Sequence, residues 1–191
     1  MGKHRNILKA LRATVWEHAA ERPDLALMAR DLGRLVHQDA AALAAALTPF
    51  RQDHQSPVRW ELATRNKPPI SVVVMAWPAN HATPVHEHPG PWGLTMALVG
   101  ALEVQPYDRD AATGDLLQLD RTWLGPGDGI WFEAEGGQTH RCRNLSRHET
   151  ALSLHVYGGD LAECAACGQA EPAGTWMPPA HRRATTGHLP G

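Results

Sequence analysis

The hydrophobic pattern divides the chain into a helical part followed by a strand-rich part. Over the first fifty residues, apolar side chains recur at spacings of three and four, the period of one helix face. Three such stripes follow one another: Leu8, Leu11, Val15 and Ala19; Leu25, Met28, Leu32 and Leu35; and Leu43, Leu47 and Phe50. Pro23 suits the first turn of the second helix, and Asp39 can cap the third. Residues 1–52 are therefore expected to form helices that pack on a larger unit.

From about residue 55 the pattern changes to short runs rich in Val, Leu and Trp, separated by Pro and Gly. The predicted strands are 70–77, 83–88, 94–99, 102–107, 116–124, 129–132, 140–145 and 150–157. Many short strands at nearly regular spacing are typical of an all-β barrel or sandwich, and the lack of intervening helices argues against a parallel α/β sheet. A barrel is expected over residues 53–167. The Pro- and Gly-rich tail over 168–191 lacks a period and is expected to wrap the barrel or to be partly disordered.

Composition narrows the class of protein. The 191 residues suit one domain, and 43% hydrophobic with 20% charged residues excludes a wholly disordered chain. The net charge of -2 argues against a nucleic-acid binder with a broad basic surface. No window approaches the roughly 18 apolar residues of a membrane span, and the first twenty residues do not read as a signal peptide. We expect a cytoplasmic protein that binds neither nucleic acid nor membrane.

The cysteines do not form a disulfide framework, because there are only three of them and no signal peptide is expected. Cys164 and Cys167 form a CxxC pair, but a zinc knuckle would need a second close pair. Two structural or surface cysteines are the expected reading of this pair.

Histidines are frequent, with 12 in the chain, and two stand two residues apart in a predicted strand. Because side chains alternate between the faces of a strand, His86 and His88 point to one side and Glu87 to the other. Two such imidazoles can bind one metal ion. His140 follows about fifty residues later, and facing strands of a small barrel can bring it to the pair as a third ligand. The alternative is a scatter of core or surface histidines.

The HxH pair, followed by Gly137-Gln138-Thr139-His140 and then Asn144, resembles the two motifs of the cupin barrel. That resemblance implies a mainly β fold, a double-stranded β-helix or jelly-roll barrel, with the N-terminal helices packed on it. Cupins usually carry a glutamate ligand five residues after the second histidine, where this chain has Gly93. The expected site therefore consists of three neutral histidines.

A second polar group lies in the last predicted strand. Ser153, His155 and Tyr157 share one face, and Leu154 and Val156 share the other. Three polar side chains on a buried face are costly unless they hydrogen-bond one another. We predict a chain from the serine hydroxyl through the histidine ring to the tyrosine hydroxyl, which would hold the tyrosine oxygen near the metal. The alternative is that this polar face points outward.

Taken together, these segments resemble the thiol dioxygenases, the family of cysteine dioxygenase and 3-mercaptopropionate dioxygenase. The matching segments are PVHEH at 84–88, WG at 92–93, HRCRN at 140–144 and SLHVYG at 153–158. Trp77 and the N-terminal helices also fit, and the resemblance spans residues 5–160. It implies that His86, His88 and His140 bind Fe(II), and that Ser153, His155 and Tyr157 form a catalytic relay beside the metal. It further implies oxidation of a small thiol, cysteine or a mercapto-carboxylic acid, to its sulfinic acid with both atoms of dioxygen.

The chain departs from the family at two places. Animal cysteine dioxygenases have a cysteine that cross-links to the tyrosine, where this chain has Gly93, as bacterial relatives commonly do. The cysteine enzymes bind the substrate carboxylate with an arginine at the position of Trp60, and the mercaptopropionate enzymes use an arginine soon after the tyrosine, where none stands here. Arg59 is the first candidate anchor, brought in by a one-residue slip or bulge, and Arg65 is the second.

Three tryptophans, Trp60, Trp77 and Trp92, are candidates for the walls of a substrate pocket, although packing is the commoner role of this residue. Other functions stay open. They are a cupin oxygenase that acts on a different thiol or oxidises it further, a metal-binding cupin without oxygenase activity (an isomerase, a sensor or a zinc hydration enzyme), and a scaffold for protein interactions. The expected partners are a small thiol and dioxygen. The oligomeric state is left open.

Overall fold

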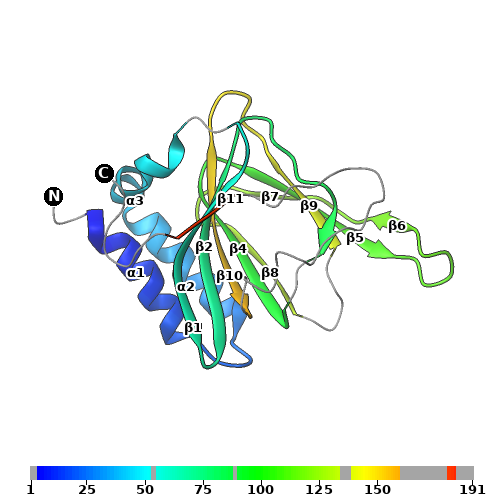
Figure 1. Cartoon of the computed structure of the whole chain (residues 1–191), viewed down its shortest axis with the longest axis horizontal. Helices are drawn as coiled ribbons and strands as arrows, with labels where there is room; N and C mark the ends of the chain where they lie inside the picture. Colours follow the sequence, from blue (N-terminus) through cyan, green and yellow to red (C-terminus); the bar gives the residue numbers. More distant parts are fainter. Residues whose placement is uncertain (1–3, 53–54, 88–89, 134–138, 160–179, 184–191) are drawn as a thin grey trace.

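The computed structural model of the chain describes residues 4–52, 55–87, 90–133, 139–159 and 180–183. Three α-helices come first: α1 (His4–Glu17), α2 (Leu25–Gln38) and α3 (Ala40–Leu47), then the 3-10 helix η1 (Thr48–Arg51) (Figure 1). The strands are β1 (Val58–Asn66), β2 (Pro69–Trp77), β3 (His86–Glu87), β4 (Trp92–Val99), β5 (Leu102–Arg109), β6 (Leu116–Gln118), β7 (Thr122–Leu124), β8 (Gly129–Glu133), β9 (Thr139–Asn144), β10 (Ala151–Gly158) and β11 (Ala180–Arg183).

The strands form two sheets that face each other. The first sheet has the order β11-β1-β2-β10-β4-β8, and the second has β3-β9-β5-β6, with β7 also paired to β5. All these pairs are antiparallel except β1 with β11. Between the sheets lies an apolar cluster with members from both: Trp77, Ala97 and Ala151 from the first, and Leu102, Val104, Leu124 and Cys142 from the second. The predicted mainly β class is confirmed.

The helices cover the outer face of the first sheet (Figure 1). Trp60, Val74 and Leu154 are in register on neighbouring strands and belong to one buried cluster with helix residues such as Leu11 and Leu32. Because side chains alternate along a strand, the residues between them face the interior of the barrel. The helices thus bury one set of strand positions and leave the alternate set for a site between the sheets.

The helix ends follow from local hydrogen bonds. Asp39 caps α3 by accepting from the Ala42 amide at 3.1 Å, which confirms the predicted cap. At α2 the cap is Asp24, which accepts from the Leu27 amide at 2.9 Å, so Pro23 lies outside the helix and not in its first turn. An aspartate side chain satisfies an otherwise unpaired amide at a helix start, and this interaction decides the boundary here.

Two strands have no counterpart among the predicted ones. β1 has an irregular pattern of burial and a register shift between Glu61 and Ala63, so it lacks the apolar alternation by which strands are recognised. β11 lies within the predicted C-terminal tail and pairs with β1. In addition, the predicted strand 116–124 is two strands, β6 and β7, and the predicted strand 83–88 is described only as β3.

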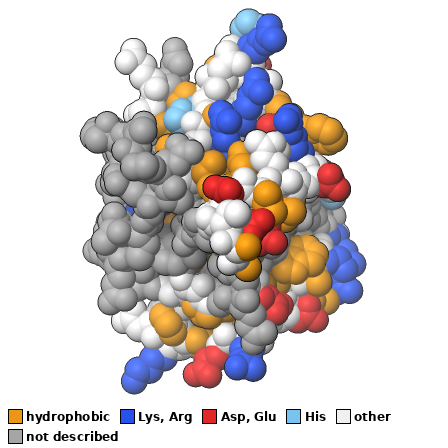
Figure 2. Space-filling model, turned by 90° about the vertical axis from the view of Figure 1, so that its right-hand side faces the viewer, with side chains coloured by type: hydrophobic (Ala, Val, Ile, Leu, Met, Phe, Trp, Pro, Cys, Tyr) orange, Lys and Arg blue, Asp and Glu red, His pale blue; other side chains and the backbone are white. Residues whose placement is uncertain are grey.

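The other side of the molecule, beyond the second sheet, carries charged and apolar side chains interspersed (Figure 2). The exposed large hydrophobic residues include Leu117, Leu119 and Trp123 on β6, β7 and the turn between them. No helix in the described part of the chain has the length and apolar character needed to cross a membrane.

Candidate active site

The interior face of β10 carries the predicted polar row. The Ser153 hydroxyl lies 2.7 Å from Nε2 of His155, and Nδ1 of His155 lies 2.9 Å from the Tyr157 hydroxyl. All three side chains are buried, and Leu154 and Val156 pack toward the helices. The hydrogen-bond chain that strand alternation predicts is thus present. We call these three residues the relay.

Two further side chains extend the relay. The indole Nε1 of Trp77 donates to the Ser153 hydroxyl at 2.7 Å, and the Thr95 hydroxyl lies 3.0 Å from Nδ1 of His155. Thr95 stands directly opposite His155 on β4. The sequence pattern singles out Trp77 but not Thr95. Thr95 comes to lie beside His155 through a pairing between strands about sixty residues apart.

The second sheet brings two of the three predicted metal ligands together. His86 of β3 and His140 of β9 are in register, and their ring centroids are 4.8 Å apart. Nδ1 of His86 lies 3.0 Å from the Pro84 carbonyl oxygen, so the ring donates from Nδ1 and carries its lone pair on Nε2. This is the arrangement typical of a metal-binding histidine.

His88, the third predicted ligand, lies outside the described residues. Within the part of the chain that is described, no group of three His, Cys, Asp or Glu side chains is placed to hold a metal. The pair His86 and His140 suits the chemistry of a metal site, because both are imidazoles on neighbouring strands.

Burial keeps the site histidines neutral. It lowers the pKa of His140 to about 3, with smaller contributions from His86 and His155. Burial also lowers the pKa of His86, against the opposing effect of its bond to the Pro84 carbonyl. A histidine must be neutral to bind a metal, so both rings are held in the ligand form at neutral pH.

Arg59 faces the relay. It pairs with Met75, which pairs with Ser153, so the three residues lie on one face of the first sheet. The charge of Arg59 helps to lower the pKa of His155, after the larger effects of burial and of His86. Its Nε is buried and has no hydrogen-bond partner among the described residues. A buried guanidinium nitrogen without an acceptor is costly.

The register shift of β1 comes after Arg59, between Glu61 and Ala63. The predicted slip is therefore not what turns Arg59 inward, since its pairing with β2 is regular. Arg65, the second candidate, is exposed near the end of the strand.

The three candidate tryptophans lie on two different faces of the first sheet. Trp77 faces the interior and contacts the relay. Trp60 packs on the helix side, with its ring 4.8 Å from that of Phe50 in an edge-to-face contact. Trp92 also belongs to the helix-side cluster and lies close against Gly158. The structure does not bring Trp60 and Trp92 together with the relay, because alternation along their strands turns them to the opposite face.

The barrel and the site lie in a segment that matches a known protein family. The family model for cysteine dioxygenase type I matches residues 53–170, more than half of the chain. The chain belongs to this family. This confirms the resemblance seen in the sequence. Membership in the cysteine dioxygenase family makes the chain a metal-dependent enzyme of the oxygenase class, and its two-sheet barrel is a cupin fold.

The solved structures to which the chain is similar are distant in sequence. A cupin superfamily protein from Desulfitobacterium hafniense is 13% identical, with a TM-score of 0.42 over 56% of this chain and 81% of that one. An oxalate oxidase bound to the substrate analogue glycolate is 15% identical, with a TM-score of 0.42 over 59% and 55%. An oxalate decarboxylase from Bacillus subtilis is 15% identical, with a TM-score of 0.38 over 48% and 22%.

Gly93 is enclosed at the point where animal members of the cysteine dioxygenase family have their cross-linking cysteine. A Cβ atom added to Gly93 would collide with the ring of Phe132 and lie 3.0 Å from Cδ1 of Tyr157. Phe132 and Tyr157 pack in one small cluster with Val73. In this chain the Phe132 ring therefore takes the space beside the tyrosine that a side chain at position 93 would need.

Asn144, the last residue of the cupin-like motif, bonds to the end of β2 and to the turn that follows its own strand, β9. Its side-chain amide donates to the carbonyl oxygens of Trp77 at 2.9 Å and Glu149 at 2.8 Å, and its side-chain oxygen accepts from the Ser146 amide. Asn144 is fully buried, so each of these bonds replaces one to water. It joins the end of β2 to the turn between β9 and β10, the strands that carry Trp77, His140 and the relay.

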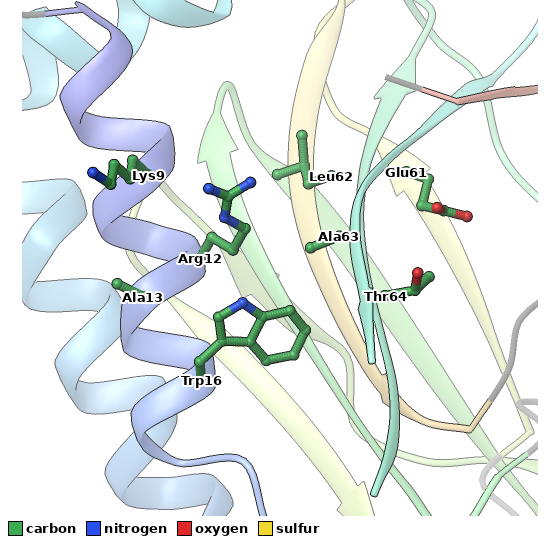
Figure 3. Close-up of a pocket in the computed structure, with 8 residues that line it drawn as sticks. All are labelled: Lys9, Arg12, Ala13, Trp16, Glu61, Leu62, Ala63 and Thr64. Atoms are coloured by element: carbon green, nitrogen blue, oxygen red, sulfur yellow. The ribbon is translucent and has the colours of Figure 1, made fainter. Parts of the chain in front are cut away.

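A surface hollow of about 500 Å³ lies elsewhere, between α1 and β1 (Figure 3). Lys9, Arg12 and Trp16 line it from the helix, and Leu62 and Ala63 line it from the strand. It is on the helix side of the first sheet, opposite the relay, so it belongs to no part of the site described above.

The buried His155 predicts a loss of stability in mild acid. Burial lowers its pKa to about 3, whereas in the unfolded chain it titrates near 6.5. Below about pH 6.5 the unfolded state therefore binds a proton that the folded state does not, and stability falls as the pH falls toward 3. We expect His155 to account for about 2 kcal/mol of the decrease in unfolding free energy between pH 7 and pH 5.

Urea unfolding of the metal-free protein at the two pH values measures this decrease. His155→Gln keeps a polar side chain without the titration, so its decrease between pH 7 and pH 5 should be smaller than that of the wild type by that amount. An equal decrease in both proteins would show that His155 is not neutral in the folded state.

Proposed function

We propose that this protein is an Fe(II)-dependent thiol dioxygenase that converts a small carboxylate-bearing thiol to its sulfinic acid. In the reaction, both atoms of dioxygen are added to the sulfur, so dioxygen is the oxidant and no external reductant is needed. The supporting observation is the meeting, inside one barrel, of two neutral imidazoles from one sheet and a buried Ser–His–Tyr relay from the other. A purely structural metal site has no need of the relay.

The metal would be held by His86 and His140, together with His88 from the HxH pair. When bound, Fe(II) would supply open positions for a thiolate and dioxygen and would lower the pKa of the thiol. Three neutral ligands leave the full positive charge of the metal to attract an anionic sulfur.

The residues of the first sheet would bind and orient the substrate. Arg59 offers its guanidinium to a carboxylate, and its buried Nε supports this role because it lacks an acceptor within the described part of the chain. Tyr157 presents a hydroxyl that His155 orients, so that it donates a hydrogen bond to the substrate or to the bound oxidant. Trp77 and the other members of the apolar cluster between the sheets would keep water from the relay.

Dioxygen consumption by Fe(II)-loaded protein tests the proposal. The panel of thiols is cysteine, cysteamine, 3-mercaptopropionate and mercaptosuccinate. We expect one of the carboxylate-bearing thiols to give dioxygen uptake with one sulfinate formed per dioxygen, as measured by an oxygen electrode and mass spectrometry. Bound iron with no uptake from any thiol would contradict the dioxygenase proposal and favour a cupin without oxygenase activity.

Tyr157→Phe tests the role of the hydroxyl. The variant keeps the ring that packs on Phe132 and should retain iron, because the tyrosine is not a predicted ligand. Loss of one hydrogen bond to the reacting groups should lower kcat by roughly 10- to 100-fold, or lower the yield of sulfinate per dioxygen consumed. Tyr107→Phe is the matched control, because Tyr107 is the other tyrosine of the chain and lies on β5 of the second sheet. Unchanged turnover and yield in Tyr157→Phe would remove Tyr157 from the mechanism.

A further inference from the structure

Thr95 forms an unexpected contact with the relay. Its hydroxyl lies 3.0 Å from Nδ1 of His155, and the Tyr157 hydroxyl lies 2.9 Å from the same nitrogen. Thr95 is 4% exposed and stands directly opposite His155 in the pairing of β4 with β10. One ring nitrogen thus faces two hydroxyl groups, although it carries either one hydrogen or one lone pair.

The opposite end of the imidazole decides where the hydrogen is. Trp77 can only donate, and it donates to the Ser153 hydroxyl. Ser153 is fully buried, and His155 is its other hydrogen-bond partner among the described side chains, so the serine hydrogen goes to Nε2 of His155. Nε2 then holds the lone pair and Nδ1 holds the hydrogen. That single hydrogen lies between the oxygens of Thr95 and Tyr157.

We propose that Thr95 is a positioning residue that shares the Nδ1 hydrogen of His155 with Tyr157 and thereby limits how strongly His155 polarises the tyrosine. A phenol that accepts a hydrogen bond ionises more easily, because the same bond is stronger to the phenolate. With Thr95 in place, Tyr157 receives part of the bond and stays a protonated donor. This inference rests on the proposed function only in one respect, namely that the Tyr157 hydroxyl donates its hydrogen toward the substrate or the oxidant.

The ionisation of Tyr157 measures the sharing directly. The chain has two tyrosines, so Tyr107→Phe leaves Tyr157 as the only one. In this background, fluorotyrosine is incorporated and its ionisation is followed by fluorine NMR in the full-length, metal-depleted protein. Fluorination lowers the intrinsic pKa of the phenol, so the titration is complete at a lower pH than with tyrosine. Circular dichroism at the same pH values checks that the protein is folded.

Thr95→Val removes the hydroxyl and keeps the shape of the side chain. His155 then donates only to Tyr157, and we expect the pKa of Tyr157 to fall by about one unit. A shift of this size corresponds to part of the free energy of a hydrogen bond to a charged group. Thr95→Ser keeps the hydroxyl and should titrate as the background does. Arg59, His86 and His140, the charged and titratable groups that surround the relay, are the same in all the variants, so they cancel in the comparison.

An unchanged pKa in Thr95→Val would overturn the inference. Equal shifts in Thr95→Val and Thr95→Ser would also overturn it, because they would indicate altered packing and not the loss of the hydroxyl. The titration needs neither bound metal nor turnover. Failure of the dioxygenase assay would therefore leave this result intact, and the two proposals can fail separately.

Discussion

His86→Ala and His140→Ala are each expected to abolish iron retention and, with it, thiol-dependent dioxygen uptake. The two rings come from adjacent strands, and burial keeps both neutral, which is the form that binds a metal. Removal of one of three predicted protein ligands leaves a site too weak to hold Fe(II) through gel filtration. Iron per chain is measured by elemental analysis after Fe(II) loading and desalting. We expect less than about a tenth of the wild-type iron content, with a loss of uptake at least in proportion to the loss of iron.

His148→Ala is the matched control, because His148 is an exposed histidine on the turn between β9 and β10. It should bind iron as the wild type does. Circular dichroism of the metal-free variants separates loss of a ligand from loss of the fold. A folded His86→Ala or His140→Ala protein with normal iron content would show that the iron is bound elsewhere.

The helices and most strands could be predicted because their apolar residues have a clear period. The stripe of Leu25, Met28 and Leu32 becomes the buried face of α2, and the run 70–77 becomes β2. β1 and β11 lack such a pattern. β1 is stabilised by pairing with β2, and its exposed end carries Thr64, Arg65 and Asn66, which lack the apolar alternation of a strand. Tertiary pairing, not local propensity, makes it a strand.

In the candidate site, too, some residues could be placed from the local pattern, and others depend on how distant strands pair. Alternation along one strand was enough to place Ser153, His155 and Tyr157 on one face. Thr95 and Arg59 could not be placed in this way, because each comes to the relay through a register between strands far apart in the chain. A pattern within a segment predicts which side chains share a face. It does not predict which segment will lie beside it.

The second large effect is expected from Arg59→Met with carboxylate-bearing thiols. A charge-assisted hydrogen bond inside a barrel contributes up to about 3 kcal/mol, so its loss should raise KM roughly 100-fold for these substrates. Cysteamine has no carboxylate, so any turnover of it should change little. Steady-state dioxygen uptake with each thiol measures the ratio. Arg65→Met on the same strand is the matched control, since Arg65 is exposed and should leave KM unchanged.

The same variant separates a substrate anchor from a structural arginine. A structural arginine stabilises the fold through its partners, and its replacement lowers the free energy of unfolding. Arg59 has a buried Nε without an acceptor among the described residues, so methionine of similar length should leave the free energy of unfolding unchanged or raise it. A marked loss of stability with an unchanged KM would assign Arg59 to the structure. Retained stability with a raised KM for carboxylate thiols alone would assign Arg59 to substrate binding, because a substrate carboxylate that pairs with Arg59 accounts for both results.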